Sequence, residues 1–366
     1  MSVSTHPAPT LPHRSLAIGV FVLAVALAGC ANANSQGTLS GAVATVATSA
    51  QASTAVTNPT PPAATASAVA SPVPSPSPSF AALKLLWEKG GPTPSQPETW
   101  QPAIDPVSGN IWVAASFDNV FWIFSPEGRY LESWGTPGSG AGQLSLTTHD
   151  QNPSPRGSIA FVADGGFYVA DSGNNRIQQF DKDRHYVRQF GGFGHTDGKF
   201  TRPLQVLTDG KTVYVTDDDQ MNVQAFDMAG KHLRTLRWSS HGGIQLDGSG
   251  RIVTTPGDNT APTDLALFIV DPSTGQTLET YPLPPLGQVA FPQAVDRNGD
   301  IFVIIYPDAD TAPSAPGAGV ELGPTGKVIA TWSTDAVETA AVAPDGKAIY
   351  YGSGWAFIRK FALPTP

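Results

Sequence analysis

A short turn sequence recurs six times in the chain, and this repetition constrains the fold more than any other feature. The turns are rich in Asp and Gly, and a β-prone run such as residues 111–113 or 167–169 follows them. The copies lie at residues 105–109, 163–166, 209–210, 247–250, 296–299 and 344–346. Short β-prone runs between evenly spaced turns are typical of all-β folds, and a repeat of roughly 40–50 residues is typical of a propeller blade.

Each copy has a second regular feature, a strand that ends on an apolar residue. In the first five copies an aromatic residue 10 to 12 positions later closes a further strand. The apolar ends are Phe124, Phe180, Phe226, Val270, Leu322 and Phe361, and the aromatic ends are Trp134, Phe190, Trp238, Tyr281 and Trp332. The sixth copy stops soon after Phe361, whereas a matching strand stands at residues 83–87. The sequence therefore predicts an all-β, six-bladed β-propeller in which an N-terminal strand completes the last blade and covers its edge.

One repeat resembles a known family. Residues 159–180, IAFVADGGFYVADSGNNRIQQF, resemble an NHL repeat, and residues 192–203, GFGHTDGKFTRP, resemble that family's connector to the next blade. Residues 212–217 open a second copy, and residues 100–144 resemble a third. The resemblance implies an NHL-type propeller, a fold that hosts many functions and so specifies no activity.

The start of the chain has the pattern of an export signal. An apolar run at residues 16–27 is shorter than the roughly 20 residues that a membrane-spanning helix needs, which is typical of a secretory signal peptide. It ends in Leu-Ala-Gly-Cys at residues 27–30, which resembles the lipobox of bacterial lipoproteins. This resemblance implies a signal peptide at residues 1–29, lipidation of Cys30 and a lipid-anchored location in the bacterial cell envelope. A buried structural cysteine is the competing interpretation of Cys30, the only cysteine in the chain.

A neutral stretch separates this signal from the repeats. Residues 31–79 contain no charged and no aromatic side chain and end in a Ser- and Pro-rich run. Such a composition cannot bury enough apolar surface to offset the entropy of ordering, so we expect a disordered tether at residues 30–79 and the propeller at residues 80–366. The chain has 21 Lys+Arg against 30 Asp+Glu, which disfavours a nucleic-acid partner. We expect a monomeric domain that meets the membrane only through the lipid.

The lengths of the connections distinguish the two faces of the predicted ring. In an antiparallel blade, the connections after the first and third strands lie at one face, and the other connections lie at the opposite face. The short turns belong to the first face, and the long connectors belong to the second: residues 135–156, 191–202, 256–262 and 307–319. Because long loops on a rigid scaffold often bear function, we expect the functional surface at this second face. Neutral variation in loop length is the competing interpretation.

Polar side chains at the starts of the innermost strands border the predicted channel on the long-loop face. Arg156, Arg202 and His241 fall at equivalent places in three successive repeats, and Gln293 follows in a later one. Two guanidinium groups and an imidazole that converge there would suit a carboxylate, a phosphate or a sugar acid. The sequence thus predicts a ligand site formed by these four residues. In the competing interpretation they point into solvent or pair with nearby acids such as Asp150, Asp197 and Glu338.

The acidic residues after the second strands have a structural explanation. Asp171 and Asp217 occupy a repeated Asp position of the NHL family, where they are expected to accept backbone N–H bonds, with Asn175 and Arg176 as partners. Further acids on neighbouring loops could offer oxygen ligands to Ca²⁺: Asp218, Asp219, Asp258, Asp308 and Asp310. No loop has the spacing of a known calcium motif, so we expect solvated loops and no metal site.

Two enzyme families share the six-bladed propeller. Residues 201–217 resemble a segment of gluconolactonase-like hydrolases, but Leu204 and Gln205 stand where that family has a metal-binding Asn, and its catalytic Asp has no clear counterpart near Gln293. Amidating lyases, which resemble the chain through their NHL blades, bind zinc through several His at strand starts, where this chain has only His241. A zinc site with three protein ligands is therefore not supported, and we predict no catalytic residue and no cofactor.

The sequence favours a surface-anchored lipoprotein whose propeller is a non-catalytic binding module for an extracytoplasmic protein, peptide or glycan. The alternative is a metal-dependent hydrolase or lyase, of the gluconolactonase-like or amidating-lyase-like class, that uses the channel. A structural spacer in an envelope complex is a third interpretation. An aromatic patch on the long-loop face would favour binding, and acidic groups around a divalent cation would favour the enzyme.

Overall fold

The structure is a computed structural model that describes residues 80, 82–92, 99–147, 157–217, 219–237, 243–255, 265–306, 317–334, 338–353 and 357–364. These residues belong to one compact unit, Ser79–Pro366. The signal peptide, Cys30 and the tether predicted within residues 1–79 lie outside the described residues. None of the described segments contains a helix that is long and apolar enough to cross a membrane.

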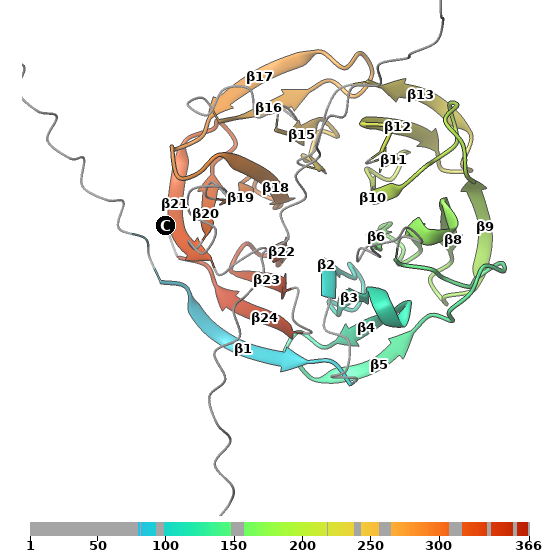
Figure 1. The fold of residues 1–366 in the computed structure, drawn as a ribbon. Helices are drawn as coiled ribbons and strands as arrows, with labels where there is room; N and C mark the ends of the chain where they lie inside the picture. Colours follow the sequence, from blue (N-terminus) through green and yellow to red (C-terminus); the bar gives the residue numbers. More distant parts are fainter. Residues whose placement is uncertain are drawn as a thin grey trace, which may run out of the picture. The chain divides into compact units, whose positions relative to one another are not determined.

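The described residues form 24 strands in six antiparallel sheets of four strands each, arranged in a ring (Figure 1). Blade 1 contains β2 (Thr99–Ile104), β3 (Ile111–Ala115), β4 (Val120–Phe124) and β5 (Tyr130–Trp134). Blade 2 contains β6 (Ser158–Phe161), β7 (Phe167–Asp171), β8 (Arg176–Phe180) and β9 (Tyr186–Gly191). Blade 3 contains β10 (Pro203–Thr208), β11 (Thr212–Asp217), β12 (Asn222–Asp227) and β13 (His232–Leu236).

Blade 4 contains β14 (Ile244–Leu246), β15 (Ile252–Thr254), β16 (Ala266–Val270) and β17 (Thr277–Pro282). Blade 5 contains β18 (Val289–Val295), β19 (Ile301–Tyr306), β20 (Gly317–Leu322) and β21 (Val328–Thr334). Blade 6 contains β22 (Glu338–Val342), β23 (Ala348–Ser353), β24 (Phe357–Ala362) and, as its outermost strand, β1 (Lys84–Gly90). The predicted six-bladed propeller is confirmed.

The N-terminal strand β1 closes the ring, as the sequence predicts. It pairs antiparallel with β24, from Lys84 opposite Ala362 to Gly90 opposite Phe357. The strand extends beyond the predicted range of 83–87, because its last residues continue the ladder. Glu88 also bonds the guanidinium of Arg359 on β24 at 2.7 Å.

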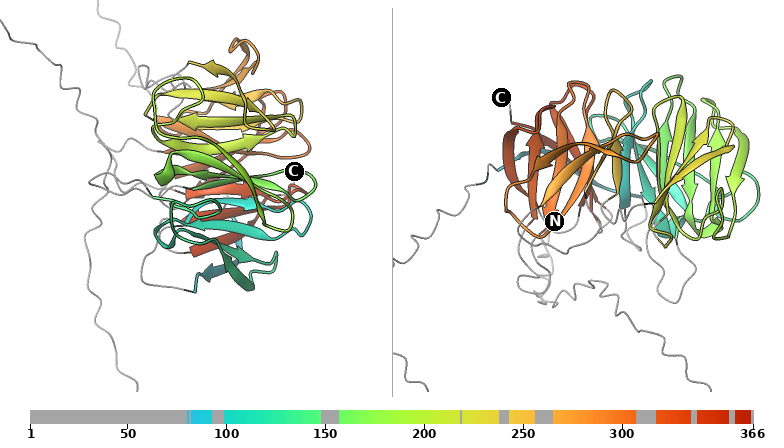
Figure 2. Two further views of the ribbon diagram at one scale, coloured as in Figure 1. Left: turned by 90° about the vertical axis from the view of Figure 1, so that its right-hand side faces the viewer. Right: turned by 90° about the horizontal axis from the view of Figure 1, so that it is seen from above.

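The short turns owe their shape to aspartate side chains. The carboxylates of four turn aspartates accept the backbone N–H groups two and four residues further on, which fixes a tight loop: Asp181, Asp227, Asp247 and Asp296. The turns after the first and third strands of each blade lie at one face, here called the tight-turn face. The opposite face, here called the long-loop face, receives the connections after the second strand and between blades (Figure 2).

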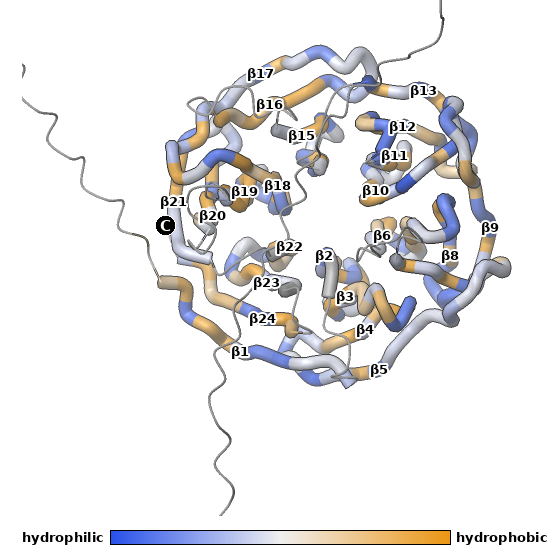
Figure 3. Tube along the Cα trace, in the orientation of Figure 1, coloured by the Kyte–Doolittle hydropathy of each residue, from blue (hydrophilic) through white to orange (hydrophobic). Residues whose placement is uncertain are grey.

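The hydrophobic core is distributed around the ring, between neighbouring blades. Among the described residues, six clusters of buried side chains fill the six interfaces between adjacent blades. Between blades 2 and 3, for example, Tyr168 of β7 and Phe226 of β12 belong to one cluster. Hydrophobic stretches accordingly occur on strands of every blade in Figure 3. The blade sheets are therefore covered on both faces and give the long-loop face a rigid base.

Candidate functional site

The long-loop face is described in part. Every gap between residues 92 and 357 in the described residues lies between strands that end at this face. Arg156 and His241, two of the four predicted ligand residues, fall in these gaps and lie outside the described residues. Their predicted convergence with Arg202 therefore stays a prediction.

Arg202 lies immediately before β10 and forms an ion pair. Its Nη2 lies 2.6 Å from Oδ1 of Asp219, and its backbone N–H donates to Asp217 at 3.2 Å. The pairing follows from strand register, because Pro203 lies opposite Asp217 and so brings Arg202 beside the residues that follow Asp217. The partner is an acid, as the competing interpretation expects, although it is neither Asp150, Asp197 nor Glu338.

Gln293 lies in β18 and joins two blades. Its Oε1 accepts the backbone N–H of Ala340 in β22 at 2.9 Å. Gln205 of blade 3 makes the same kind of bond, accepting the N–H of Ile244 in blade 4 at 3.1 Å. Because the oxygen of Gln293 bonds the neighbouring blade, its amide has a structural role at the inner edge of the ring in addition to any role toward a ligand.

Asp171 ends β7 and is fully buried. Its carboxylate accepts the backbone N–H of Ser145 at 2.6 Å and the side-chain N–H groups of Asn174, Arg176 and Gln178 at 2.6 to 3.0 Å. Burial raises the pKa of Asp171, and the hydrogen bonds and the charge of Arg176 oppose that shift. The predicted structural role and the partner Arg176 thus agree with the structure.

The prediction that Asn175 is also a partner of Asp171 is wrong. Asn175 adopts a left-handed backbone at φ 54°, where it ends the short 3₁₀ turn Ser172–Asn174, and Asn174 supplies the side-chain bond to Asp171. An Asn tolerates the left-handed conformation better than most residues, which accounts for its place in the turn. The sequence pattern Asn-Asn did not reveal which of the two faces the carboxylate.

Asp217 holds the equivalent place at the end of β11. It accepts the backbone N–H of Thr201 at 2.8 Å and that of Gln220 at 3.2 Å, and also bonds the side chains of both residues. No group of three His, Cys, Asp or Glu side chains in the described part of the chain could hold a metal ion. The predicted acids Asp218, Asp258, Asp308 and Asp310 lie outside the described residues.

These bonds make the connector from blade 2 to blade 3, residues 191–202, a fixed structure. Gln224 of β12 accepts the N–H of Gly198 at 2.7 Å and donates to the carbonyl of Lys199 at 2.7 Å. Gln220 donates to the carbonyl of Gly194 at 3.1 Å. Every one of these side chains comes from the strand or turn that the connector crosses, so the connector is held along its length.

One exposed aromatic side chain lies on this connector. Phe193 is 71% exposed, and its ring contacts the imidazole of His195 edge-on at 5.9 Å between centroids. Met221, beside Gln220 in the neighbouring turn, is also exposed, at 43%. Phe193 was not predicted from the sequence, because no local pattern distinguishes an exposed Phe on this connector from a buried one such as Phe200.

Comparison with known families identifies one of the repeats, in blade 2. Residues 157–180 match the family model described as NHL repeat. Blade 2 is therefore of the NHL type. The NHL match covers β6, β7 and β8, which include Asp171 and its partner Arg176.

Solved structures share the propeller at low identity. A gluconolactonase from Xanthomonas campestris is 11% identical at a TM-score of 0.50, covering 74% of this chain and 88% of that one. A virginiamycin B lyase from Staphylococcus aureus is 12% identical at a TM-score of 0.48, covering 76% of this chain and 99% of that one. A search of curated proteins finds no match to the chain. At 11% identity the likeness to the gluconolactonase shows the fold and no activity.

Proposed function

We propose that the protein is a non-catalytic binding module whose NHL-type propeller binds an extracytoplasmic protein, peptide or glycan through its long-loop face. The observation that supports this function is Phe193, which is 71% exposed on a connector held by Asp217, Gln220 and Gln224. Exposed aromatic side chains on rigid scaffolds are typical anchors of binding surfaces.

The rigidity of the connector supports this proposal, because ordering a flexible loop during binding would cost conformational entropy. A connector that is already ordered loses little freedom when a partner covers it, so more of the contact energy appears as affinity. A phenyl ring can pack into an apolar pocket of a protein or against the apolar face of a sugar. Met221, exposed in the neighbouring turn, adds apolar surface to the same blade.

The test is a screen of immobilised glycans and peptides with three forms of the protein. Wild type and Leu278→Ala, a control at a 51% exposed apolar residue on the outer strand of blade 4, are expected to bind the same ligands. Phe193→Ala is expected to lose about tenfold or more in affinity, the loss typical of an interface anchor. Unchanged affinity of Phe193→Ala for every ligand would contradict the role of Phe193. One divalent metal ion per purified chain would instead favour the hydrolase or lyase alternative.

We further propose that the module is exported and anchored by a lipid on Cys30, with residues 30–79 as a tether. The proposal rests on the apolar run at residues 16–27 and the lipobox-like sequence that ends at Cys30. Wild type is expected to fractionate with membranes and to enter the detergent phase, whereas Cys30→Ser is expected in the aqueous phase. A matched variant, Ser35→Ala, should behave as wild type. Membrane fractionation of Cys30→Ser would contradict the lipid anchor.

A further inference from the structure

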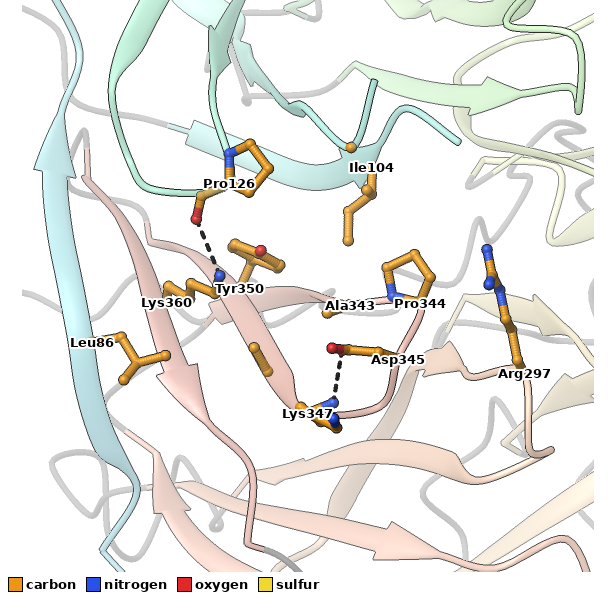
Figure 4. A pocket seen from close by; sticks show the side chains of 12 residues that line it. Leu86, Ile104, Pro126, Arg297, Ala343, Pro344, Asp345, Lys347, Tyr350 and Lys360 are labelled. Carbon is orange, nitrogen blue, oxygen red and sulfur yellow. Dashed lines mark hydrogen bonds between the residues drawn. The ribbon is translucent and has the colours of Figure 1, made fainter. Parts of the chain in front are cut away.

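A pocket of about 430 Å³ opens on the tight-turn face, where blade 6 meets blade 1 (Figure 4). Its apolar wall includes Ile104 and Pro126 from blade 1 and Tyr350 of β23 in blade 6. The volume lies within the range of pockets that hold small molecules, and an apolar wall with a few polar groups is typical of them. The pocket lies on the face opposite to the proposed partner-binding surface.

The polar groups of this pocket are mainly cationic. Arg297, Lys347 and Lys360 line it, against a single carboxylate, that of Asp345. In Figure 4, Lys360 and Arg297 lie on opposite sides of the pocket. This local excess of positive charge stands out in a chain with 30 acidic and 21 basic residues. It favours an anionic ligand.

The ammonium group of Lys360 has a fixed position. Its Nζ donates to the carbonyl oxygen of Pro126 at 3.1 Å and lies 5.1 Å from the centre of the Tyr350 ring. The bond to Pro126 occupies one of the three ammonium protons, so the group can still donate to a ligand. The ring and the ammonium together offer an apolar contact beside a charge-assisted hydrogen-bond donor.

Acids also lie near these cations. The pKa of Glu127, an exposed residue, is lowered by the hydroxyl of Ser125, which donates to its carboxylate at 2.8 Å, and to a smaller extent by the charge of Lys360. Asp345 accepts the backbone N–H of Lys347 at 3.1 Å, the same turn-forming role that aspartates of other short turns have. Among the described residues, Arg297 has no ion pair of the kind that holds Arg251 to Asp247 or Arg359 to Glu88. Its guanidinium therefore remains available to a carboxylate.

We propose that this pocket binds a small organic carboxylate with an aliphatic or aromatic body. The carboxylate bonds the ammonium group of Lys360, and the body packs on Ile104 and Tyr350. Arg297, from the turn between β18 and β19 of blade 5, adds positive charge on the opposite side of the pocket. The pocket wall also includes Leu86 of β1, so the ligand contacts the strand that closes the ring together with the two blades that it joins. Binding therefore stabilises ring closure, which makes thermal unfolding a direct readout.

The experiment measures the melting temperature of the full chain with hexanoate and phenylacetate, and with their neutral amides as probes of the same shape. The acids are expected to raise the melting temperature of wild type by about 2–5 °C near saturation, and the amides by much less. The control Lys231→Gln, in an exposed turn of blade 3, should respond as wild type. Lys360→Gln, which keeps an N–H donor for Pro126, should lose most of the response. Arg297→Gln, at an exposed turn residue of blade 5, should lose a smaller part of it.

Each other result overturns the proposal. Equal shifts with acids and amides would show that charge has no part in binding. Full shifts in both Lys360→Gln and Arg297→Gln would place the acids elsewhere on the molecule. Equal shifts with inorganic phosphate would show an anion site without a pocket for the apolar body, and no shift at all in wild type would remove the site. Since Phe193→Ala leaves this face unchanged, its response to the acids separates the proposal from the function of the long-loop face.

Discussion

Two aspartates at equivalent positions, Asp171 and Asp217, hold their connectors by different means. Asp171 forms a buried ion pair with Arg176 at 2.6 Å. The residue at the place of Arg176 in blade 3 is Asn222, so the bonds that we find for Asp217 come from neutral donors. The same backbone arrangement is therefore stabilised by charge in blade 2 and by neutral hydrogen bonds in blade 3.

This difference predicts unequal costs for the same substitution. Asp171→Asn leaves the buried guanidinium of Arg176 without its counter-charge and is expected to lower the free energy of unfolding by about 3–5 kcal/mol. Asp217→Asn weakens hydrogen bonds only and is expected to cost about 1–3 kcal/mol. Urea unfolding of the two variants measures both values. A loss in Asp217→Asn as large as that in Asp171→Asn would contradict the role given to charge.

Glu321 is a buried carboxyl group in β20 whose Oε2 has no hydrogen-bond partner among the described residues. Its cross-strand neighbour Phe302 belongs to the cluster between blades 5 and 6, so Glu321 lies on the side of blade 5 that faces blade 6. Burial and the nearby carboxylates of Asp300 and Asp296 raise the pKa of Glu321 to about 7. The ionised form is therefore unfavourable in the folded protein.

This raised pKa predicts that stability falls as pH increases. Below the ordinary value of 4.5, Glu321 is protonated in both the folded and the unfolded chain. Between pH 4.5 and about 7 the unfolded chain releases the proton first, so the free energy of unfolding decreases, and above that range the loss is complete. Relative to Glu321→Gln, wild type is expected to lose about 1–3 kcal/mol across this window, as measured by urea unfolding at each pH. The exposed control Glu127→Gln should not remove this loss, and equal pH profiles of wild type and Glu321→Gln would contradict the prediction.

At the scale of elements, the aromatic residues that close the outer strands pack on the turns of the next blade. An added Cβ at three turn glycines would lie within 2.4–2.7 Å of the aromatic ring from the preceding blade. The pairs are Gly128 with Trp87, Gly230 with Phe190, and Gly326 with Tyr281. The regular aromatic spacing in the sequence thus reflects a contact between blades, which periodicity within one repeat did not reveal.

Two glycines allow the energetic cost of this contact to be measured apart from the cost of the backbone conformation. Gly230 and Gly210 both have positive φ, at 86° and 80°, but a Cβ at Gly210 meets no atom within 4 Å. Gly210→Ala is therefore expected to cost about 1 kcal/mol, from the left-handed backbone alone. Gly230→Ala adds a collision with Phe190 and is expected to cost about 2–4 kcal/mol. Chemical denaturation of both variants measures the difference in the free energy of unfolding. Equal costs would show that the Phe190 side chain moves aside without strain.

The elements were more predictable than the contacts between them. Four of the predicted apolar ends are the last residues of their strands: Phe124, Phe180, Val270 and Leu322. These positions follow from local periodicity and turn chemistry, and both can be read from the sequence. The ion pair of Arg202 with Asp219 and the pocket around Lys360 depend on strand register and on how two blades meet, and neither has a local sequence pattern.

At the scale of the whole molecule, one strand makes the repeats a closed ring. The sixth repeat lacks its outer strand, and β1 supplies it from the other end of the unit. The sequence predicted this closure because Phe361 is followed by too few residues for another strand. Without β1 the edge of β24 would be unpaired, and its backbone groups would be exposed to pairing with another chain.

The closing strand also joins blade 6 to blade 1 through side chains. The indole N–H of Trp87 donates to the carbonyl of Pro126 in blade 1 at 3.2 Å, and its ring lies 5.9 Å from that of Tyr350. Loss of a buried Trp side chain typically costs about 3–5 kcal/mol, and loss of Trp87, which is half-buried, is expected to cost less. Removal of β1 exposes the edge of β24 in addition, so the cost should exceed that of Trp87→Ala alone.

Deletion of residues 83–90 is expected to lower the melting temperature by about 10 °C or more and to promote aggregation, whereas Trp87→Ala should give a smaller decrease. Calorimetry measures the first effect, and sedimentation velocity measures the second. A deletion of equal length in the predicted tether, residues 61–68, should leave the melting temperature unchanged, which separates loss of the strand from shortening of the chain. If the 83–90 variant melted like the parent and stayed monomeric, blade 6 would be stable with an open edge, and the ring would not depend on β1 for its closure.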